Sequence, residues 1–309
     1  MNCSLERLYF LLGVKRQRFF EIRKRDDKVL EMEQQLHYMI HNIRQDHPEM
    51  GVREMYFKMK PAGIGRDAFE SFCSKQGYMC QRKKNFTRTT DSTGVERFPN
   101  QMAEMQHLVD SPNQLWQSDI FYIEIGNRFN YVTLIQDAFI KVILGHSASI
   151  SLTTEATTLP ALKMAIKRSK NYGLKGLVLH SDGGGQYYDK EFLKLTGRYK
   201  IINSMCKYPW DNGMAESLNN VIKNKYLKHR NIKSLNELQL ELDRTVLLYN
   251  SEKPHSSLKR KTPLEFEKYW LNLICQKNAT ETESFDAEIG CMGHRTPFIR
   301  AKKMLKIGM

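Results

Sequence analysis

Three acidic residues stand in contexts that could bring their carboxylates together. Asp182 follows the apolar segment LVLH and precedes three glycines, so we expect it at the carboxyl end of a strand, where open α/β sheets bind ligands. Asp119 lies inside the apolar segment WQSDIFYIEI, and Glu216 lies one turn into a helix that begins near residue 211. Mg²⁺ prefers carboxylate oxygens, so three acids on three elements could bind such hard cations.

The glycines after Asp182 allow two interpretations. A glycine-rich loop can cradle a phosphate, or it can turn the backbone sharply so that an acid stays open to a metal or substrate. The segment lacks the lysine of a G-x-x-x-x-G-K-[ST] loop, which argues against a nucleotide cradle. We therefore expect the turn to expose the carboxylate of Asp182.

The helix expected after residue 211 has one apolar side. At about 100° per residue, Leu218 and Ile222 lie around one direction, whereas Glu216 and Lys223 fall together on the opposite side. This spacing predicts that the acid and the amine point into a shared space, where one could hold a metal and the other could contact a phosphate. A solvated helix face produces the same pattern.

An α/β domain over residues 113–272 is expected to position these side chains. Apolar segments between residues 115 and 149 indicate three paired strands, and helices and strands alternate after them. The order predicts a mixed sheet flanked by helices. The polar segment over residues 81–112 is expected to be a linker, and residues 273–309 a disordered tail.

The N-terminal part is predicted to be all-α. We expect a helical segment over residues 1–25 and a helix-turn-helix DNA-binding domain over residues 26–80, in which two short helices flank a Gly-containing turn. Arg66 would open the second helix on a face that could enter a DNA groove, and Lys83 and Lys84 begin a linker that could follow the phosphate backbone. A small helical bundle without DNA contacts fits the same pattern.

Composition favours an anionic partner. Lys and Arg number 48 against 34 Asp and Glu, which gives a net charge of +14 and makes nucleic acid the first candidate. The 6 cysteines form no C-x-x-C pair, so we expect no disulfide framework and a reducing compartment. The sequence contains neither a signal peptide nor an apolar run of about 18 residues, and we expect the protein in the cytoplasm.

A zinc site in the N-terminal half is a weaker alternative. His37 and His41 stand four positions apart on an expected helix, and Cys73 and Cys80 follow. Six residues separate the two cysteines, whereas about two are usual in structural zinc sites. The helical interpretation of this segment is therefore preferred.

Four segments, taken in order, resemble the catalytic core of OrfB-type insertion-sequence transposases, which are relatives of retroviral integrases with a ribonuclease-H-like fold. They are WQSDI, HSDGGGQY, DNGMAESLNNVIK and YNSEKPHSSLKRKTP. The segment GVREMYFKMKPAGIGRDAF resembles the helix-turn-helix that precedes the core in this group. The resemblance covers roughly residues 5–270 and implies a ribonuclease-H-like mixed sheet preceded by an all-α domain.

The resemblance also implies the chemistry. Asp119, Asp182 and Glu216 match the family's DDE triad and would be both the catalytic residues and the ligands of two Mg²⁺ ions, for which Mn²⁺ can substitute. Lys223 matches the family's basic residue and would bind DNA. The implied activity is metal-dependent DNA strand cleavage and strand transfer during transposition. The implied partners are element ends, target DNA, further copies of the chain and an upstream OrfA-type product, in the nucleoid of a bacterium.

Two other functions stay open. Asp182 and Glu216 are separated by 33 residues, two fewer than is usual in the family, so a catalytically decayed helix-turn-helix protein that only binds DNA is the alternative. A ribonuclease acting on RNA–DNA hybrids would share the sheet but would not need the N-terminal helices. Metal-dependent strand transfer distinguishes the transposase from both.

Overall fold

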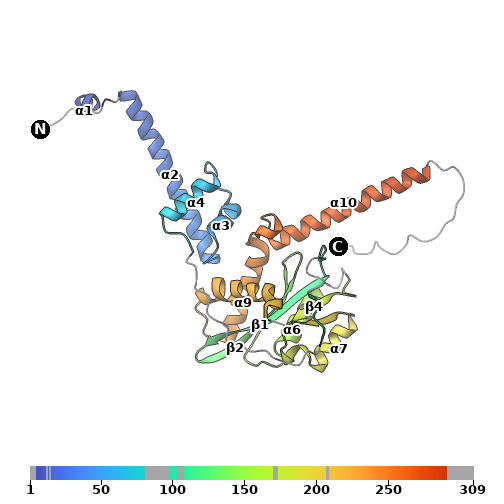
Figure 1. Ribbon diagram of the computed structural model, residues 1–309. Helices are drawn as coiled ribbons and strands as arrows, with labels where there is room; N and C mark the ends of the chain where they lie inside the picture. Colours follow the sequence, from blue (N-terminus) through green and yellow to red (C-terminus); the bar gives the residue numbers. More distant parts are fainter. Residues whose placement is uncertain are drawn as a thin grey trace. The chain divides into compact units, whose positions relative to one another are not determined.

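The computed structural model describes residues 5–11, 13, 15–80, 98–102, 108–169, 173–206 and 209–290. The chain divides into two compact units, residues 1–265 and 266–309. The first unit holds the N-terminal helices and the sheet domain (Figure 1). None of the helices in these described ranges is long and apolar enough to cross a membrane.

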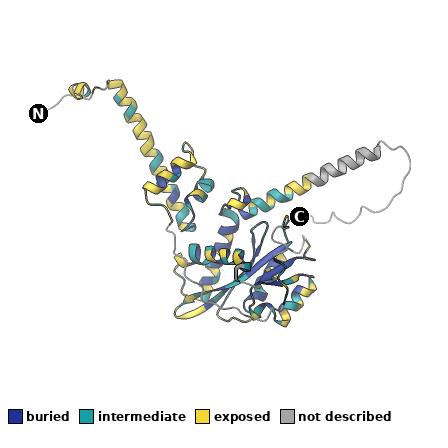
Figure 2. Cartoon of the chain, in the orientation of Figure 1, coloured by how far each residue is buried: buried dark blue, intermediate teal, exposed yellow. Residues whose placement is uncertain are grey.

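A five-stranded mixed sheet forms the centre of the domain, with strand order β3-β2-β1-β4-β5. The first three strands form an antiparallel meander, and β4 and β5 run parallel to β1. The strands are β1 (Leu115–Ile125), β2 (Arg128–Asp137), β3 (Ile143–Ser149), β4 (Val178–Ser181) and β5 (Ile202–Met205). Figure 2 shows that much of the sheet is buried. The predicted mixed sheet is therefore confirmed.

Helices pack against this sheet in positions that the sequence helps to fix. They are α6 (Thr158–Ser169), α7 (Lys190–Arg198), α8 (Gly213–Asn220) and α9 (Leu235–Glu252). Side-chain caps start two of them: Asp189 accepts a hydrogen bond from the N–H of Glu191, and Ser234 accepts one from Glu237. At Gly145 of β3, a Cβ atom would lie 2.0 Å from the carbonyl oxygen of Ala161, so only glycine allows α6 to approach this closely.

The YN pair of the last motif attaches α9 to the sheet. The side chain of Asn250 accepts a hydrogen bond from the backbone N–H of Ile143 at 2.9 Å and donates one to its carbonyl at 3.0 Å. The hydroxyl of Tyr249 accepts a hydrogen bond from Gln136 at 2.9 Å. Because both side chains are buried, these residues act in the core of the domain and not at its surface.

The N-terminal helices form a small core of their own. They are α1 (Leu5–Leu11), α2 (Arg16–Asp46), α3 (Val52–Met59) and α4 (Arg66–Lys75). Leu36 and Ile40 of α2 pack with Met55 and Phe69 from the helices that follow. We placed a boundary between residues 25 and 26, but α2 runs through it, and its first half is mostly exposed (Figure 2).

Two other segments differ from the expected organisation. Residues 98–102, which we assigned to the linker, pack on the sheet domain: Met102 is buried beside Leu115, and the backbone N–H of Gln101 donates to Ser204 at 3.0 Å. We expected residues 273–309 to lack order, but helix α10 (Pro263–Gly290) continues well past residue 273. The few apolar residues of residues 273–290 do not recur at helical spacing, so the sequence pattern did not indicate this extension.

Candidate active site

The two aspartates occupy neighbouring positions on parallel strands. In the register of β1 and β4, Gln117 pairs with His180, and the same register continued by two residues would bring Asp119 level with Asp182, directly after β4 ends at Ser181. Adjacent strands lie about 4.8 Å apart. The two carboxyl-bearing residues, 63 positions apart in the chain, are therefore neighbours at the carboxyl end of the sheet's central parallel pair.

The pKa of Asp119 links all three acids. Burial, and then the negative charges of Asp182 and Glu216, raise the pKa of Asp119 to about 7, although hydrogen bonds from Ile120 and Asn219 act in the opposite direction. Burial also raises the pKa of Asp182. A carboxylate that loses water and gains anionic neighbours is less stable than its protonated form. The charges of the two other predicted triad residues thus act on Asp119, that of Asp182 from the end of β4 and that of Glu216 from α8.

Asn219 connects α8 to the first aspartate. Its amide donates to Oδ2 of Asp119 at 2.8 Å, and the backbone N–H of Ile120 donates to Oδ1 at 2.9 Å. Because Asn219 follows Glu216 by three positions, the two lie on the same side of the helix. Our sequence interpretation missed this residue; its spacing from Glu216 was the available signal. The carbonyl Oδ1 of Asn219 is buried without a hydrogen-bond partner.

The chemistry of the donor set suits a hard cation. Within the part of the chain that the structure describes, no three His, Cys, Asp or Glu side chains stand as a ready metal cluster. Asp119 and Asp182 supply only oxygen ligands, the kind that Mg²⁺ prefers. A bound divalent cation would also compensate the mutual repulsion that raises the pKa of Asp119. The residues present therefore fit such an ion by their chemistry.

The glycines after Asp182 allow close contacts with its carboxylate. The N–H of Gly184 donates to Oδ1 of Asp182 at 3.1 Å, and a Cβ atom at this position would lie 3.0 Å from the same oxygen and 2.8 Å from Oε1 of Gln186. The φ of Gly184 is −63°, which any residue adopts. Limited space beside the carboxylate, and not an unusual backbone turn, is thus what favours glycine at residue 184.

Lys223 lies in a π-helical turn, Val221–Tyr226, that continues α8. Its Nζ is 4.3 Å from the centre of the Tyr122 ring, and burial, followed by the charge of Lys228, lowers its pKa. A spacing of 100° per residue does not apply across a π-helical turn. The shared direction that we predicted for Glu216 and Lys223 therefore does not follow from their spacing, and the phosphate contact stays a prediction.

The other predicted DNA-binding residues are at the N-terminal side. Arg66 opens α4, as expected, and its guanidinium lies 2.8 Å from Asp67 and 3.8 Å from Glu70. Lys83 and Lys84 lie outside the described residues. The DNA contacts of all three remain predictions.

The residues of the weaker zinc alternative have separate contacts. Nδ1 of His37 lies 2.6 Å from the hydroxyl of Tyr78, and His41 contacts Gln45 at 3.3 Å. Cys73 is buried in the helical core, where burial raises the pKa of its thiol to about 11. A thiol with a raised pKa is a poor metal ligand, because metals bind the thiolate.

Comparison with known proteins identifies the sheet domain. Two family models, both described as an integrase core domain, match residues 109–208 and 198–263, which together make up about half of the chain. A transposase for insertion sequence element IS629 of Shigella sonnei is 29% identical over 229 residues, or 72% of this chain and 75% of that protein. The chain belongs to the integrase-core family of insertion-sequence transposases.

Other proteins are also similar to this chain. An uncharacterized 31 kDa protein of insertion element IS600 from Shigella sonnei is 27% identical over 80% of this chain and 90% of its own length. A putative transposase for IS986/IS6110 of Mycobacterium tuberculosis is 25% identical over 70% and 81%. The catalytic core of HTLV-2 integrase, solved with magnesium, covers 50% of this chain and 96% of its own, with 21% identity and a TM-score of 0.40. DNA cleavage and transfer is the general activity of the family.

Proposed function

We propose that this transposase cleaves DNA at the ends of its insertion element and joins those ends to target DNA, with Asp119, Asp182 and Glu216 as the metal-binding catalytic residues. One observation carries the proposal: the pKa of Asp119 is raised to about 7 by burial and by the charges of the two other acids. Carboxylates whose pKa is strongly shifted by burial and by neighbouring charges are typical of catalytic sites.

The proposed metal is Mg²⁺, with Mn²⁺ as a substitute. Two such ions, when bound, stabilise the attacking and leaving oxygens of an in-line phosphoryl displacement. Asp119, Asp182 and Glu216 would hold these ions, because the charges of the two other acids act on Asp119. Asn219 and Gly184 hold the two aspartates through hydrogen bonds and so limit how far they must move.

The nucleophiles that we propose are water for cleavage and a DNA 3′-hydroxyl for joining. Tyr187 is one side chain that could otherwise attack, since the charges of Asp182 and Asp119 act on it. However, it is fully buried, burial raises its pKa well above the usual range, and its hydroxyl lies 2.8 Å from Oγ of Ser118. A protonated, buried phenol is a poor nucleophile. These properties favour a reaction without a covalent protein–DNA intermediate.

The short connection before α8 is compatible with activity. Asn219, in the helix after that connection, reaches Asp119 at 2.8 Å, so α8 remains seated on β1. This contact favours the active enzyme over the decayed DNA-binding protein. The charge of +14 supports DNA as the partner, to which we assign Lys223, Arg66, Lys83 and Lys84 as candidate contacts. Joining two element ends also favours a multimer, and an OrfA-type product stays a proposed partner.

The test is Mg²⁺-dependent cleavage and strand transfer of element-end DNA by wild type and by Asp182→Asn. We expect the variant to lose about 10³-fold in rate, because an amide cannot replace an anionic ligand. Asp189→Asn is the matched control: it makes the same change in the same segment, but asparagine can still cap α7. It should stay within about twofold of wild type. Wild-type activity in Asp182→Asn would end the assignment.

A further inference from the structure

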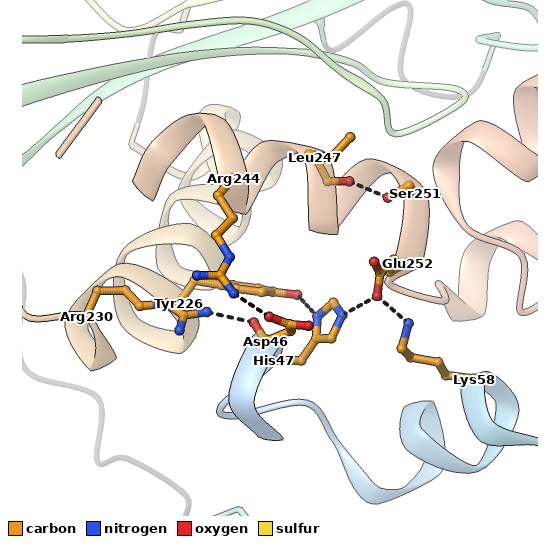
Figure 3. Close-up of polar contacts among 9 residues, drawn as sticks. All are labelled: Asp46, His47, Lys58, Tyr226, Arg230, Arg244, Leu247, Ser251 and Glu252. Carbon is orange, nitrogen blue, oxygen red and sulfur yellow. Dashed lines mark hydrogen bonds and ion pairs between the residues drawn. The ribbon is translucent and has the colours of Figure 1, made fainter. Parts of the chain in front are cut away.

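The end of α2 lies against the segment that continues α8 and against α9 (Figure 3). Arg230, which follows that segment, donates to the carbonyls of Gln45 and Asp46 at 3.0 Å each. Arg244 of α9 donates to the carboxylate of Asp46 at 2.6 Å. Carbonyls in the last turn of a helix have no partner within the helix, and guanidinium groups are favourable there. The N-terminal helices are thus attached to the catalytic domain by groups that suit a helix end.

His47 is the centre of this contact. Its side chain is 1% exposed, its Nδ1 lies 2.8 Å from the hydroxyl of Tyr226, and its Nε2 lies 3.2 Å from Glu252, which also accepts from Lys58 at 2.6 Å. A carboxylate can only accept, so Nε2 donates to Glu252 and Nδ1 accepts from the hydroxyl of Tyr226. Burial lowers the pKa of His47, in keeping with a neutral ring. Every polar atom of the ring has a partner.

Tyr226 is part of the same helical segment as the catalytic glutamate. It ends the π-helical turn that begins directly after α8, ten residues beyond Glu216. Ile222, between the two, is fully buried in the core below the sheet, and Asn219 contacts Asp119. A π-helical turn inserts an extra residue and is often found at functional sites. The helical segment from Gly213 to Tyr226 is therefore held near its middle by the contact of Asn219 with Asp119 and at its C-terminal end by Tyr226.

We propose that His47, through its hydrogen bond with Tyr226, positions α8 and hence Glu216 for catalysis, so that the N-terminal helices complete the active site as well as binding DNA. This inference rests on the proposed function, because it assigns His47 as a positioning residue for the same reaction. It predicts that loss of this hydrogen bond slows strand transfer even when DNA is saturating. A contact that merely joined two parts of the chain would have no such effect.

Three variants isolate that hydrogen bond. Tyr226→Phe removes only the hydroxyl. In His47→Gln, the longer amide can replace Nε2 and keep the contact with Glu252, whereas in His47→Asn the shorter amide can replace Nδ1 and keep the contact with Tyr226. His229→Ala is the control at the same interface, because its side chain pairs with Glu49 but is 36% exposed. Exposed pairs of this kind contribute little.

The first measurement is the strand-transfer rate at saturating Mg²⁺ and DNA, together with the Kd for DNA. Tyr226→Phe and His47→Gln should each lose about tenfold in rate, the effect of one buried hydrogen bond, with Kd within about twofold of wild type. His47→Asn should recover most of the rate, and His229→Ala should match wild type. Equal losses in His47→Asn and His47→Gln, or a change in Kd alone, would contradict a positioning role.

The second measurement is hydrogen exchange of the α8 amides, Gly213–Asn220, without DNA. Exchange should rise about tenfold in Tyr226→Phe and His47→Gln but not in His47→Asn or His229→Ala. This result does not depend on activity. If wild type proves as inactive as Asp182→Asn, the proposed function fails, and exchange alone decides whether His47 holds α8. Unchanged exchange in Tyr226→Phe would overturn the inference even in an active enzyme.

Discussion

The contact of the end of α2 with α9, which includes Asp46, His47 and Glu252, is called the α2 contact. Its acids and the acids of the active site are the same residue types in opposite electrostatic environments. Burial and like charges raise the pKa of Asp119, whereas Lys58 and His47 hold the pKa of Glu252 below its usual value despite some burial. The neighbours of Asp119 destabilise its ionised form, whereas the neighbours of Glu252 stabilise its ionised form. The difference indicates that the α2 contact needs no ligand, whereas the acid cluster gains most from a bound cation.

Lys253, directly after α9, and Glu54 of α3 form a largely buried ion pair. Their atoms lie 2.8 Å apart, and the side chains are only 7% and 26% exposed. Burial alone would raise the pKa of Glu54, but the ammonium of Lys253 and the N–H of Gly51 hold it below its usual value. Loss of one partner would leave the other charge poorly solvated, which costs far more than an exposed pair.

The largest stability effect is therefore expected for Lys253→Met, at about 3 kcal/mol of destabilisation at pH 7, measured by urea unfolding. Because Glu54 has a lowered pKa in the folded state, the pair stabilises above the unfolded pKa, and this is lost as pH falls through the folded pKa. The difference from wild type should thus shrink as the pH is lowered below the unfolded pKa of Glu54. Lys233→Met, at an exposed position, is the control. Equal stability of the two variants would remove the contrast between the regions.

Asp119→Asn tests the active-site acids. This substitution should stabilise the folded protein, whereas Lys253→Met should destabilise it. In the unfolded chain the pKa of Asp119 is near 3.8, and in the folded protein it is about 7. The folded state binds more protons between these values, so its stability falls as pH rises from about 4 to about 7. The variant should lack this loss and, without metal, should be about 1.5 kcal/mol more stable than wild type at pH 8, after allowance for solvent screening.

Magnesium supplies the control for that measurement. Added Mg²⁺ should stabilise wild type at pH 8, because the ion binds the folded state only, but should have a much smaller effect on Asp119→Asn. Urea midpoints at pH 5 and pH 8, each with Mg²⁺ and with chelator, give the four values needed. If Asp119→Asn is less stable than wild type at pH 8 without metal, then repulsion among the acids does not destabilise the folded protein. The site would then have no electrostatic preference for a cation.

The sequence predicted those features of the site that depend on local pattern. Asp119 lies within an apolar strand and Asp182 directly after one, so period and chain order place both at the sheet. Glu216 lies in the expected helix, because its segment has apolar residues at helical spacing. Resemblance to the transposase family added the grouping of the three, which no local pattern contains.

Long-range contacts could not be predicted in the same way. The hydrogen bond between His47 and Tyr226 joins residues 179 positions apart, and neither residue type indicates its partner. The π-helical turn after α8 also has no period that a helical wheel would detect, so the direction of Lys223 could not be obtained from its spacing. Tertiary packing, and not local preference, decides both.

Lys223 is a basic residue, and we expect its replacement to weaken DNA binding. Its Nζ lies over the ring of Tyr122, and no ion pair links it to an acid among the residues that the structure describes. Lys223→Gln should weaken DNA binding about fivefold near 0.1 M salt and reduce the salt slope by about 1, as for the loss of one phosphate contact. Lys194→Gln on α7, which lies near Glu191, is the control. An unchanged salt slope would exclude a phosphate contact.

Arg66 should have the smallest effect, because its charge is already compensated. The guanidinium lies within ion-pair distance of both Asp67 and Glu70, and it must leave at least one of them to bind DNA. Arg66→Gln should therefore weaken DNA binding by less than about twofold at 0.1 M salt. Arg53 is the other partner of Glu70, so Arg53→Gln is the matched control. If Arg66→Gln weakens binding more than Lys223→Gln does, with a specific loss for element-end DNA, then α4 enters the groove and its ion pairs open on binding. In that case, whether a basic side chain is paired with an acid in this structure does not predict whether it binds DNA.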